Sequence, residues 1–171
     1  MKKNIILIGF MGSGKSTIAK ELAKSLDWHW LDIDHLIEDK FQCNITDLFK
    51  TKGAHFFREQ ETQILKDLLK KTKTVISTGG GIILKPENHQ YLKKLGTIIW
   101  LKVNPDTILQ RLKNNKTRPL LETKNKEAVI NNLLKERIPL YQNITDLEIE
   151  TDNKGVSEIV IEIINNQYPY Q

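Results

Sequence analysis

The sequence has only one cysteine, Cys43, among its 171 residues, so no disulfide can form within the chain. No Cys/His cluster surrounds this thiol, and it therefore gives no sign of a structural metal site. Long hydrophobic runs are lacking too, because the apolar segment 5–11 is interrupted by Gly9. We expect no export signal and no membrane-spanning segment, and we predict a cytoplasmic location.

Aromatic residues are scarce at 7%, and no basic segment is interleaved with them as in proteins that bind single-stranded nucleic acid. The net charge of +5 arises from 26 basic and 21 acidic residues that are mixed along the chain. A lysine-rich surface explains this excess, and so do small anionic ligands. A chain of this length can bury one core, so we expect a single domain over residues 1–171 that acts as a monomer, without nucleic-acid or membrane partners.

Apolar segments alternate with amphipathic segments along the chain. Short segments rich in Ile, Val and Leu predict strands at 4–8, 29–33, 74–78, 97–103 and 147–151. Helical periodicity predicts helices at 16–26, 36–41, 45–71 with a break near Gly53, 86–95, from 105 onward, 127–141 and 156–164. This regular alternation indicates an α/β protein with a three-layer α/β/α fold: a five-stranded parallel sheet with helices on both faces.

A polar segment at about 112–125 breaks the alternation and contains Pro119. Its length and lack of periodicity predict a mobile lid over a phosphate site. Within it, Arg118 could close over a transferring phosphoryl group as an arginine finger does. The alternative is a solvated surface arginine, which is where most arginines lie.

Residues 9–16, GFMGSGKS, match the phosphate-binding pattern G-x-x-x-x-G-K-[ST] between a predicted strand and a predicted helix. Glycines in such a loop let backbone N–H groups turn toward phosphate oxygens, and the positive end of the helix faces the same charge. Lys15 should reach the β and γ phosphates, and the Ser16 hydroxyl should ligate Mg²⁺. Thr17 either packs or offers a hydroxyl at the helix N-terminus. The nucleotide-binding residues predicted from the loop are Gly12, Ser13, Gly14, Lys15, Ser16 and Thr17.

A GTPase is excluded by the lack of a guanine-reading motif. Such a motif needs an acid after Asn-Lys, but Asn115 and Lys116 are followed by Thr117 and Arg118. The only Asp-x-x-Gly string, 152–155, lies at the end of the chain, where it cannot act as a switch between strands.

Two acids, Asp32 and Asp34, flank Ile33 where the second predicted strand ends. Residues two apart on a strand point to the same side, so both carboxylates can face the phosphate loop. One could order the water around Mg²⁺ while the other accepts a proton from a substrate. The alternative is that an Asp at this position caps the next helix.

Two arginines and a glycine triplet complete the candidate site. Arg58 lies one helical turn before Glu61, a spacing that also suits an ordinary surface ion pair. The triplet 79–81 follows a strand directly, which favours close backbone approach to a ligand over a plain loop. Arg137, one turn before Tyr141, offers a second anion-binding guanidinium, although it could be solvated.

Taken in order, these strings resemble the shikimate kinase family from residue 4 to about 151. The matching strings are the phosphate loop 9–16, the D-x-D pair at 32–34, F-R-x-x-E at 57–61, the triplet 79–81, R-P-L-L at 118–121 and E-R-x-P-x-Y at 136–141. The resemblance implies a nucleoside-monophosphate-kinase-like fold with ATP and Mg²⁺. It implies that the γ-phosphoryl group passes to the 3-hydroxyl of shikimate.

The resemblance also implies roles for individual residues. Asp34 would hold substrate hydroxyls and act as the base, and Lys15 with Arg118 would stabilise charge on the phosphoryl oxygens. Those implied to bind shikimate are Asp34, Arg58, Gly80 (through its N–H) and Arg137, the arginines taking the carboxylate. Those implied to serve the nucleotide and Mg²⁺ are Ser16, Asp32, Arg111 (near adenine) and Arg118. The chain departs from the family at Ala54, where members often carry Glu.

Two alternatives of different kinds remain. Another small-metabolite kinase, such as a gluconate kinase, would share the loop and the fold but gives no reason for paired arginines at 58 and 137. A binding module that had lost its chemistry should lack Lys15, Asp34 or Arg118, and all three are present.

Overall fold

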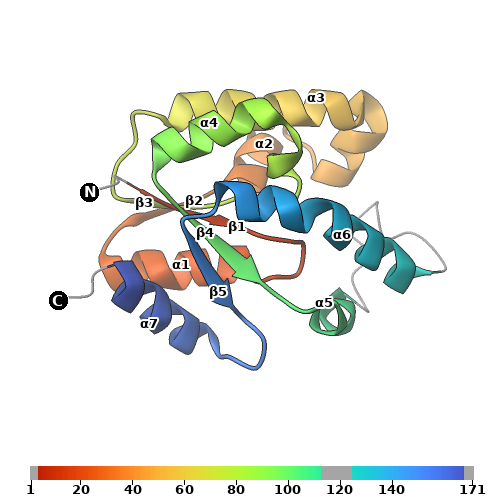
Figure 1. The fold of residues 1–171 in the computed structure, drawn as a ribbon. Coiled ribbons are helices and arrows are strands. Elements are labelled where there is room, and N and C mark those ends of the chain that lie inside the picture. The colour runs from red at the N-terminus through yellow and green to blue at the C-terminus, as the bar shows by residue number, and fades with distance from the viewer. Residues whose placement is uncertain (1–3, 113–124, 168–171) are drawn as a thin grey trace.

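A parallel five-stranded sheet forms the centre of the computed structural model, which describes residues 4–112 and 125–167 (Figure 1). The strands are β1 (Ile5–Ile8), β2 (His29–Asp32), β3 (Thr74–Ser77), β4 (Thr97–Lys102) and β5 (Leu147–Glu150). They lie in the order β2-β3-β1-β4-β5, and every neighbouring pair is parallel. Both α1 (Lys15–Leu26) after β1 and the 3-10 turn η1 (Ile82–Leu84) after β3 begin at the same edge of the sheet, but they pack on opposite faces. This arrangement opens a crevice between the carboxyl ends of β1 and β3, where ligands bind in such folds.

Helices occupy the connections between strands. They are α1 (Lys15–Leu26), α2 (Ile33–Phe41), α3 (Ile45–Leu68), η1 (Ile82–Leu84, a 3-10 turn), α4 (Pro86–Leu95), α5 (Pro105–Leu112), α6 (Lys126–Ile144) and α7 (Val156–Gln167). Helix starts follow local chemistry: Asn44 caps α3 through a bond from the Asp47 N–H, and Pro86 is the first residue of α4. Gly53 takes φ 81° and ψ 169° inside α3, so the predicted break there is confirmed.

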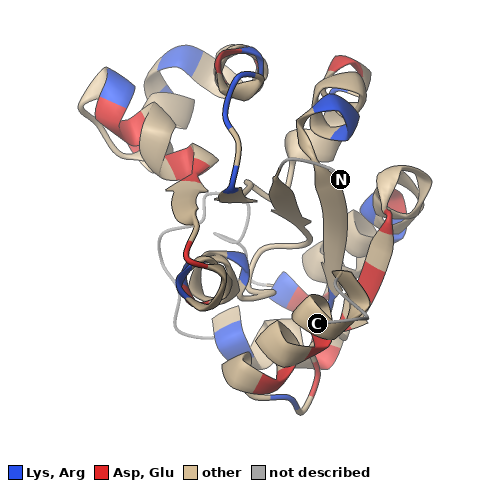
Figure 2. Cartoon of the chain, turned by 90° about the vertical axis from the view of Figure 1, so that its left-hand side faces the viewer, with Lys and Arg blue, Asp and Glu red and all other residues tan. Residues whose placement is uncertain are grey.

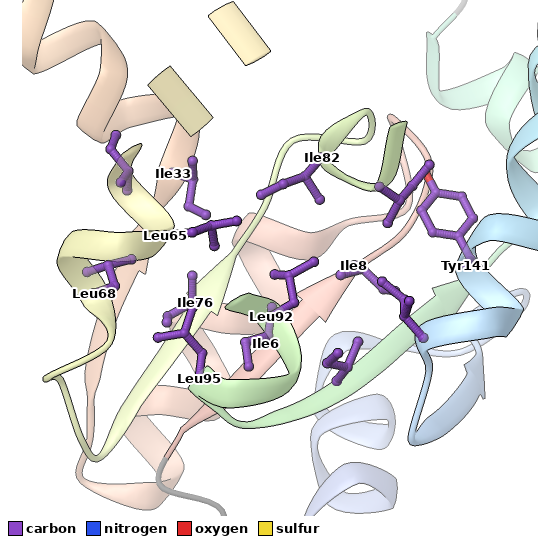
Figure 3. Close-up of a cluster of buried hydrophobic side chains, with 14 of the residues drawn as sticks. Ile6, Ile8, Ile33, Leu65, Leu68, Ile76, Ile82, Leu92, Leu95 and Tyr141 are labelled. Carbon is purple, nitrogen blue, oxygen red and sulfur yellow. The ribbon is translucent and has the colours of Figure 1, made fainter. Parts of the chain in front are cut away.

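Alternate strand residues enter two separate hydrophobic cores. Ile6 and Ile8 on β1 face the first core, where α2, α3, α4 and α6 pack. Ile5 and Leu7 face the second core, where α1 and α7 pack. Figure 3 shows the first core and Figure 1 shows the helices on the two faces. Each fully buried Ile or Leu contributes roughly 1.5–3 kcal/mol, so both faces are strongly specified, and the predicted three-layer α/β/α architecture is confirmed.

The amino-terminal edge of the sheet is fastened by one buried side chain. Asn4 Nδ2 donates to the Lys71 and Leu95 carbonyls at 2.9 Å, and its Oδ1 accepts from the Thr74 N–H at 3.1 Å. These bonds join the chain before β1 to the starts of β3 and β4. The candidate site lies at the opposite edge, beyond the carboxyl ends of the strands, where ligands bind in open α/β sheets.

Charged residues lie mostly on the helices around the sheet, with both signs interspersed (Figure 2). No helix among residues 4–112 and 125–167 is long and apolar enough to cross a membrane.

Candidate active site

A cavity of about 640 Å³ opens beyond the carboxyl ends of the strands. The residues that the sequence singled out for the acceptor and for Mg²⁺ meet there, although they come from distant parts of the chain. Those lining the cavity are Ser16, Asp32, Asp34, Arg58, residues 79–81 and Arg137. Thr17 lies instead in a shallower groove between α1, β2 and α7, which also touches Ser16.

The phosphate loop connects β1 to α1. Gly14 precedes the helix at φ 86°, a conformation that favours glycine. The first N–H groups of a helix have no partner within the helix, so they are available to an anion together with the positive helix end. The Lys15 ammonium donates to the Gly9 and Phe10 carbonyls at 2.9 Å, which holds it against the loop. This loop therefore has the donors and the fixed charge that a triphosphate needs.

Asp32 is both a helix cap and part of the site. Its Oδ1 accepts from the Asp34 and His35 N–H groups, and its Oδ2 accepts from the Ser16 and Ser77 hydroxyls at 2.6 Å each. Burial by itself would raise the pKa of Asp32, but the bonds from the Ser16 and Ser77 hydroxyls and the interactions with His35 together outweigh it and lower the pKa. The carboxylate therefore stays charged beside the Ser16 hydroxyl, a combination of hard oxygen groups suited to Mg²⁺ and its water.

The position of Asp34 differs from the one expected. The strand ends at Asp32 rather than at Ile33, and Asp34 lies in the first turn of α2. The helix begins early because Asp32 caps it, so strand alternation does not explain why both acids share the cavity. Asp34 nevertheless faces the triplet: a Cβ on Gly79 would lie 2.7 Å from Asp34 Oδ1. The absence of a side chain at Gly79 leaves room for this carboxylate.

Arg58 and Glu61 form a buried ion pair and not a surface pair. The Arg58 Nη1 donates to Glu61 Oε2 at 2.5 Å, and Glu61 is fully buried. A Cβ on Gly81 would collide with the Arg58 guanidinium, so this group lies directly against the triplet. The pair fixes the direction of Arg58, which is only one-fifth exposed, toward the cavity.

Arg137 on α6 also lines the cavity. It is 4% exposed, yet among residues 4–112 and 125–167 it makes no ion pair, and its Nε has no hydrogen-bond partner. Burial lowers the pKa of Arg137, while Tyr141 opposes the shift; an arginine nevertheless keeps its charge. Buried charges are normally paired. An unpaired guanidinium in a cavity therefore indicates an anionic ligand.

The family resemblance implies that two further arginines, Arg111 and Arg118, serve the nucleotide. Arg111 Nη1 donates to the Gly12 carbonyl at 3.0 Å, which places α5 against the loop. Its contact with adenine stays a prediction. Arg118 and nearly all of the predicted lid, 112–125, fall in 113–124, outside the described residues.

Comparisons with known proteins show which family the chain belongs to. A family model described as shikimate kinase matches residues 11–167. A shikimate kinase from a Sulfurihydrogenibium species is 43% identical over 95% of this chain and 96% of its own. One from Xylella fastidiosa is 38% identical over 94% of this chain and 89% of its own. The chain belongs to the shikimate kinase family. Members of this family use ATP as co-substrate.

A solved structure shows the same fold within the shikimate kinase family. The enzyme from Acinetobacter baumannii, in complex with shikimate, superimposes with a TM-score of 0.94 at 36% identity, covering 99% of this chain and 94% of that one. The family and the five-stranded α/β fold predicted from the motifs are both confirmed.

Three residues at this shikimate kinase site were not predicted as parts of it. Ser77 donates to Asp32, and its place at the end of a strand before the triplet was the available signal. For Glu61, the spacing to Arg58 left a surface ion pair open as an alternative, and the burial of the pair had no signal in the sequence. Tyr141 was noted within the E-R-x-P-x-Y string, but its contact with Gly80 had no signal in the sequence.

Glu61 should make stability depend on pH. Burial raises its pKa to about 7, against the attraction of Arg58 and with a contribution from Asp34. Between its ordinary pKa and about 7 the folded state holds a proton that the unfolded state has released. The wild type should therefore lose stability relative to Glu61→Gln as the pH rises from about 5 to about 7.5.

Urea unfolding of both proteins across this range measures the effect. Glu59→Gln, an exposed carboxylate on the same helix, serves as the control and should follow the wild type. A constant difference between wild type and Glu61→Gln at all pH values would contradict the titration.

Proposed function

We propose that this chain transfers the γ-phosphoryl group of ATP to the 3-hydroxyl of shikimate, giving shikimate 3-phosphate and ADP. The observation that carries the proposal is the buried Arg137 guanidinium, which makes no ion pair among the described residues and shares a cavity with Arg58 and Asp34. Two cations beside a carboxylate suit a ligand that has an acid group at one end and hydroxyls at the other. Shikimate has this form.

The acceptor is held by three groups from three helices. Arg58 and Arg137 bind its carboxylate, since a guanidinium offers paired N–H donors to two carboxylate oxygens. Asp34 accepts hydrogen bonds from its hydroxyls and takes the proton of the attacking 3-hydroxyl. The Gly80 N–H provides a further donor. Because these groups are fixed before the substrate arrives, attack requires little reorganisation.

The donor phosphates lie along the loop between β1 and α1. Lys15 and the loop N–H groups hold the β and γ phosphates, and Arg111 lies on the adenine side. Arg118 neutralises charge that develops on the transferring group.

The residues present fit Mg²⁺. Ser16 would ligate it and Asp32 would hold its water, because the carboxylate and the hydroxyl are 2.6 Å apart and both are hard oxygen groups. When bound, Mg²⁺ would neutralise phosphate charge during transfer.

Asp32→Asn tests the metal assignment. The variant keeps a side-chain oxygen for the helix cap but loses the charge, so the Mg²⁺ concentration for half-maximal activity should rise about 10- to 100-fold. The melting temperature should change little. Activity titrated with Mg²⁺ measures the effect, and an unchanged Mg²⁺ requirement would contradict the role of Asp32.

A screen of ATP consumption with shikimate, gluconate and nucleoside monophosphates tests the function itself. Shikimate alone should support turnover, with a product phosphorylated at the 3-hydroxyl by NMR. Turnover of gluconate in place of shikimate would overturn the proposal. A monomeric, single-domain enzyme in the cytoplasm remains our expectation.

A further inference from the structure

Tyr141 connects the core to the glycine triplet. It lies on α6 one turn after Arg137, is almost fully buried, and its ring stacks on Trp100 with centroids 5.6 Å apart. Figure 3 shows it reaching from α6 into the first core. At its far end the hydroxyl donates to the Gly80 carbonyl at 2.5 Å. The tyrosine is therefore held at its ring by packing and ends on a residue of the candidate site.

Arg137 approaches the same carbonyl oxygen. Its Nη1 lies 3.5 Å from the Gly80 oxygen, a much longer contact than that of Tyr141. Burial raises the pKa of Tyr141, although the Arg137 charge opposes the shift, so the phenol stays protonated and remains a donor at any pH used for assay. The short bond thus comes from Tyr141, and the guanidinium makes only the weaker one.

This arrangement has two consequences for the acceptor side. A peptide unit is planar and trans, so holding the Gly80 carbonyl also fixes the direction of the following Gly81 N–H. Successive glycines have the widest choice of backbone conformations, so the triplet needs such a constraint more than other loops do. In addition, the carbonyl is already satisfied by Tyr141, which leaves the charge of Arg137 for an anionic ligand.

We propose that Tyr141 is a positioning residue for the acceptor: it fixes the peptide of the glycine triplet and keeps Arg137 available to the substrate carboxylate. It touches neither substrate itself. The inference rests on the proposed function, because it takes shikimate as the molecule that Arg137 binds.

Tyr141→Phe removes only the hydroxyl and keeps the stacked ring. The KM for shikimate should rise roughly tenfold, the order expected for losing one hydrogen bond to a buried carbonyl. The KM for ATP should stay within twofold and kcat should change far less than the shikimate KM. Tyr91→Phe is the matched control, since its hydroxyl bonds to Glu87 on α4, away from the cavity. It should behave as wild type.

Two further measurements separate positioning from general stability. Replacing Tyr141 with 4-aminophenylalanine keeps a donor at the same place and should restore most of the shikimate affinity. In a double-mutant cycle, Tyr141→Phe should cost much less when Arg137 is already Met, because the two act through one group. Melting curves of each variant are used to choose an assay temperature well below its melting temperature.

The outcomes distinguish this inference from the proposed function. If the wild type phosphorylates shikimate and Tyr141→Phe raises both KM values equally, or lowers only the melting temperature, Tyr141 is a core tyrosine and the inference is wrong. If Tyr141→Phe and Arg137→Met are fully additive, the coupling is also wrong. If the wild type does not turn over shikimate at all, the proposed function fails instead.

Discussion

Asp34→Asn is expected to lower kcat about 10²- to 10⁴-fold, the usual effect of removing a general base. The amide has nearly the same shape as the carboxylate but cannot take the proton of the attacking hydroxyl. Asp34 lies in the first turn of α2 and faces Gly79, whereas the loop N–H groups that would hold the phosphates belong to residues 12–16 and are unchanged in the variant. ATP binding should therefore persist.

Steady-state kinetics and nucleotide titration with the purified variant measure the two expectations separately. Asp39→Asn provides the control, because Asp39 is an exposed acid on the same helix. Turnover within a few-fold of wild type would remove Asp34 from the role of base. Loss of nucleotide binding would show that the substitution acts on the loop instead.

Arg137→Met is expected to lower kcat/KM for shikimate about 10²- to 10³-fold, within the range for removing one partner of a buried, hydrogen-bonded charge pair. The KM for ATP should change little. Stability should respond in the opposite direction: an unpaired buried charge is costly, and Met occupies a similar volume without it. The variant should therefore melt at the same or a higher temperature.

The combination of lost affinity and retained stability distinguishes this prediction from simple misfolding. Thermal unfolding without ligand and kinetics with both substrates are measured on the same samples. Lys135→Met, an exposed cation on the same helix, should change neither quantity. A clear fall in melting temperature for Arg137→Met would mean that Arg137 holds the fold together and not the ligand.

The phosphate loop could be predicted closely because its chemistry is local. Contiguous residues between one strand and one helix carry the whole pattern, and Gly14 and Lys15 lie where the pattern requires. The parallel sheet followed from alternating apolar segments for a similar reason, since each strand is identified by its own residues. Element ends were less certain, as at Asp32, where a side-chain cap ends the strand and starts α2.

On the acceptor side, the sequence indicates which residues are candidates but not how they contact one another. Arg58 and Glu61 have the spacing of a surface ion pair, and nothing local shows that α3 buries them against the triplet. Tyr141 reads as an ordinary core residue, because its bond to Gly80 joins positions 61 residues apart. Such contacts depend on how helices pack on the sheet, which the family resemblance implies and periodicity does not.

The helices beside the nucleotide and those beside the acceptor pack mainly in different hydrophobic clusters, although Phe10 and Met11 of the phosphate loop pack with α5 and α6 in a third one. Helix α1, which carries the phosphate loop lysine, packs with α7 on one face, whereas the helices bearing Asp34, Arg58 and Arg137 all pack on the other. A substitution that weakens the packing on one face should therefore change the affinity for one ligand more than the affinity for the other. Substitutions during evolution can then change the affinity for shikimate separately from the affinity for the nucleotide. For an inhibitor that occupies only the acceptor side of the cavity, we expect resistance substitutions chiefly among the residues that pack under α2, α3 and α6.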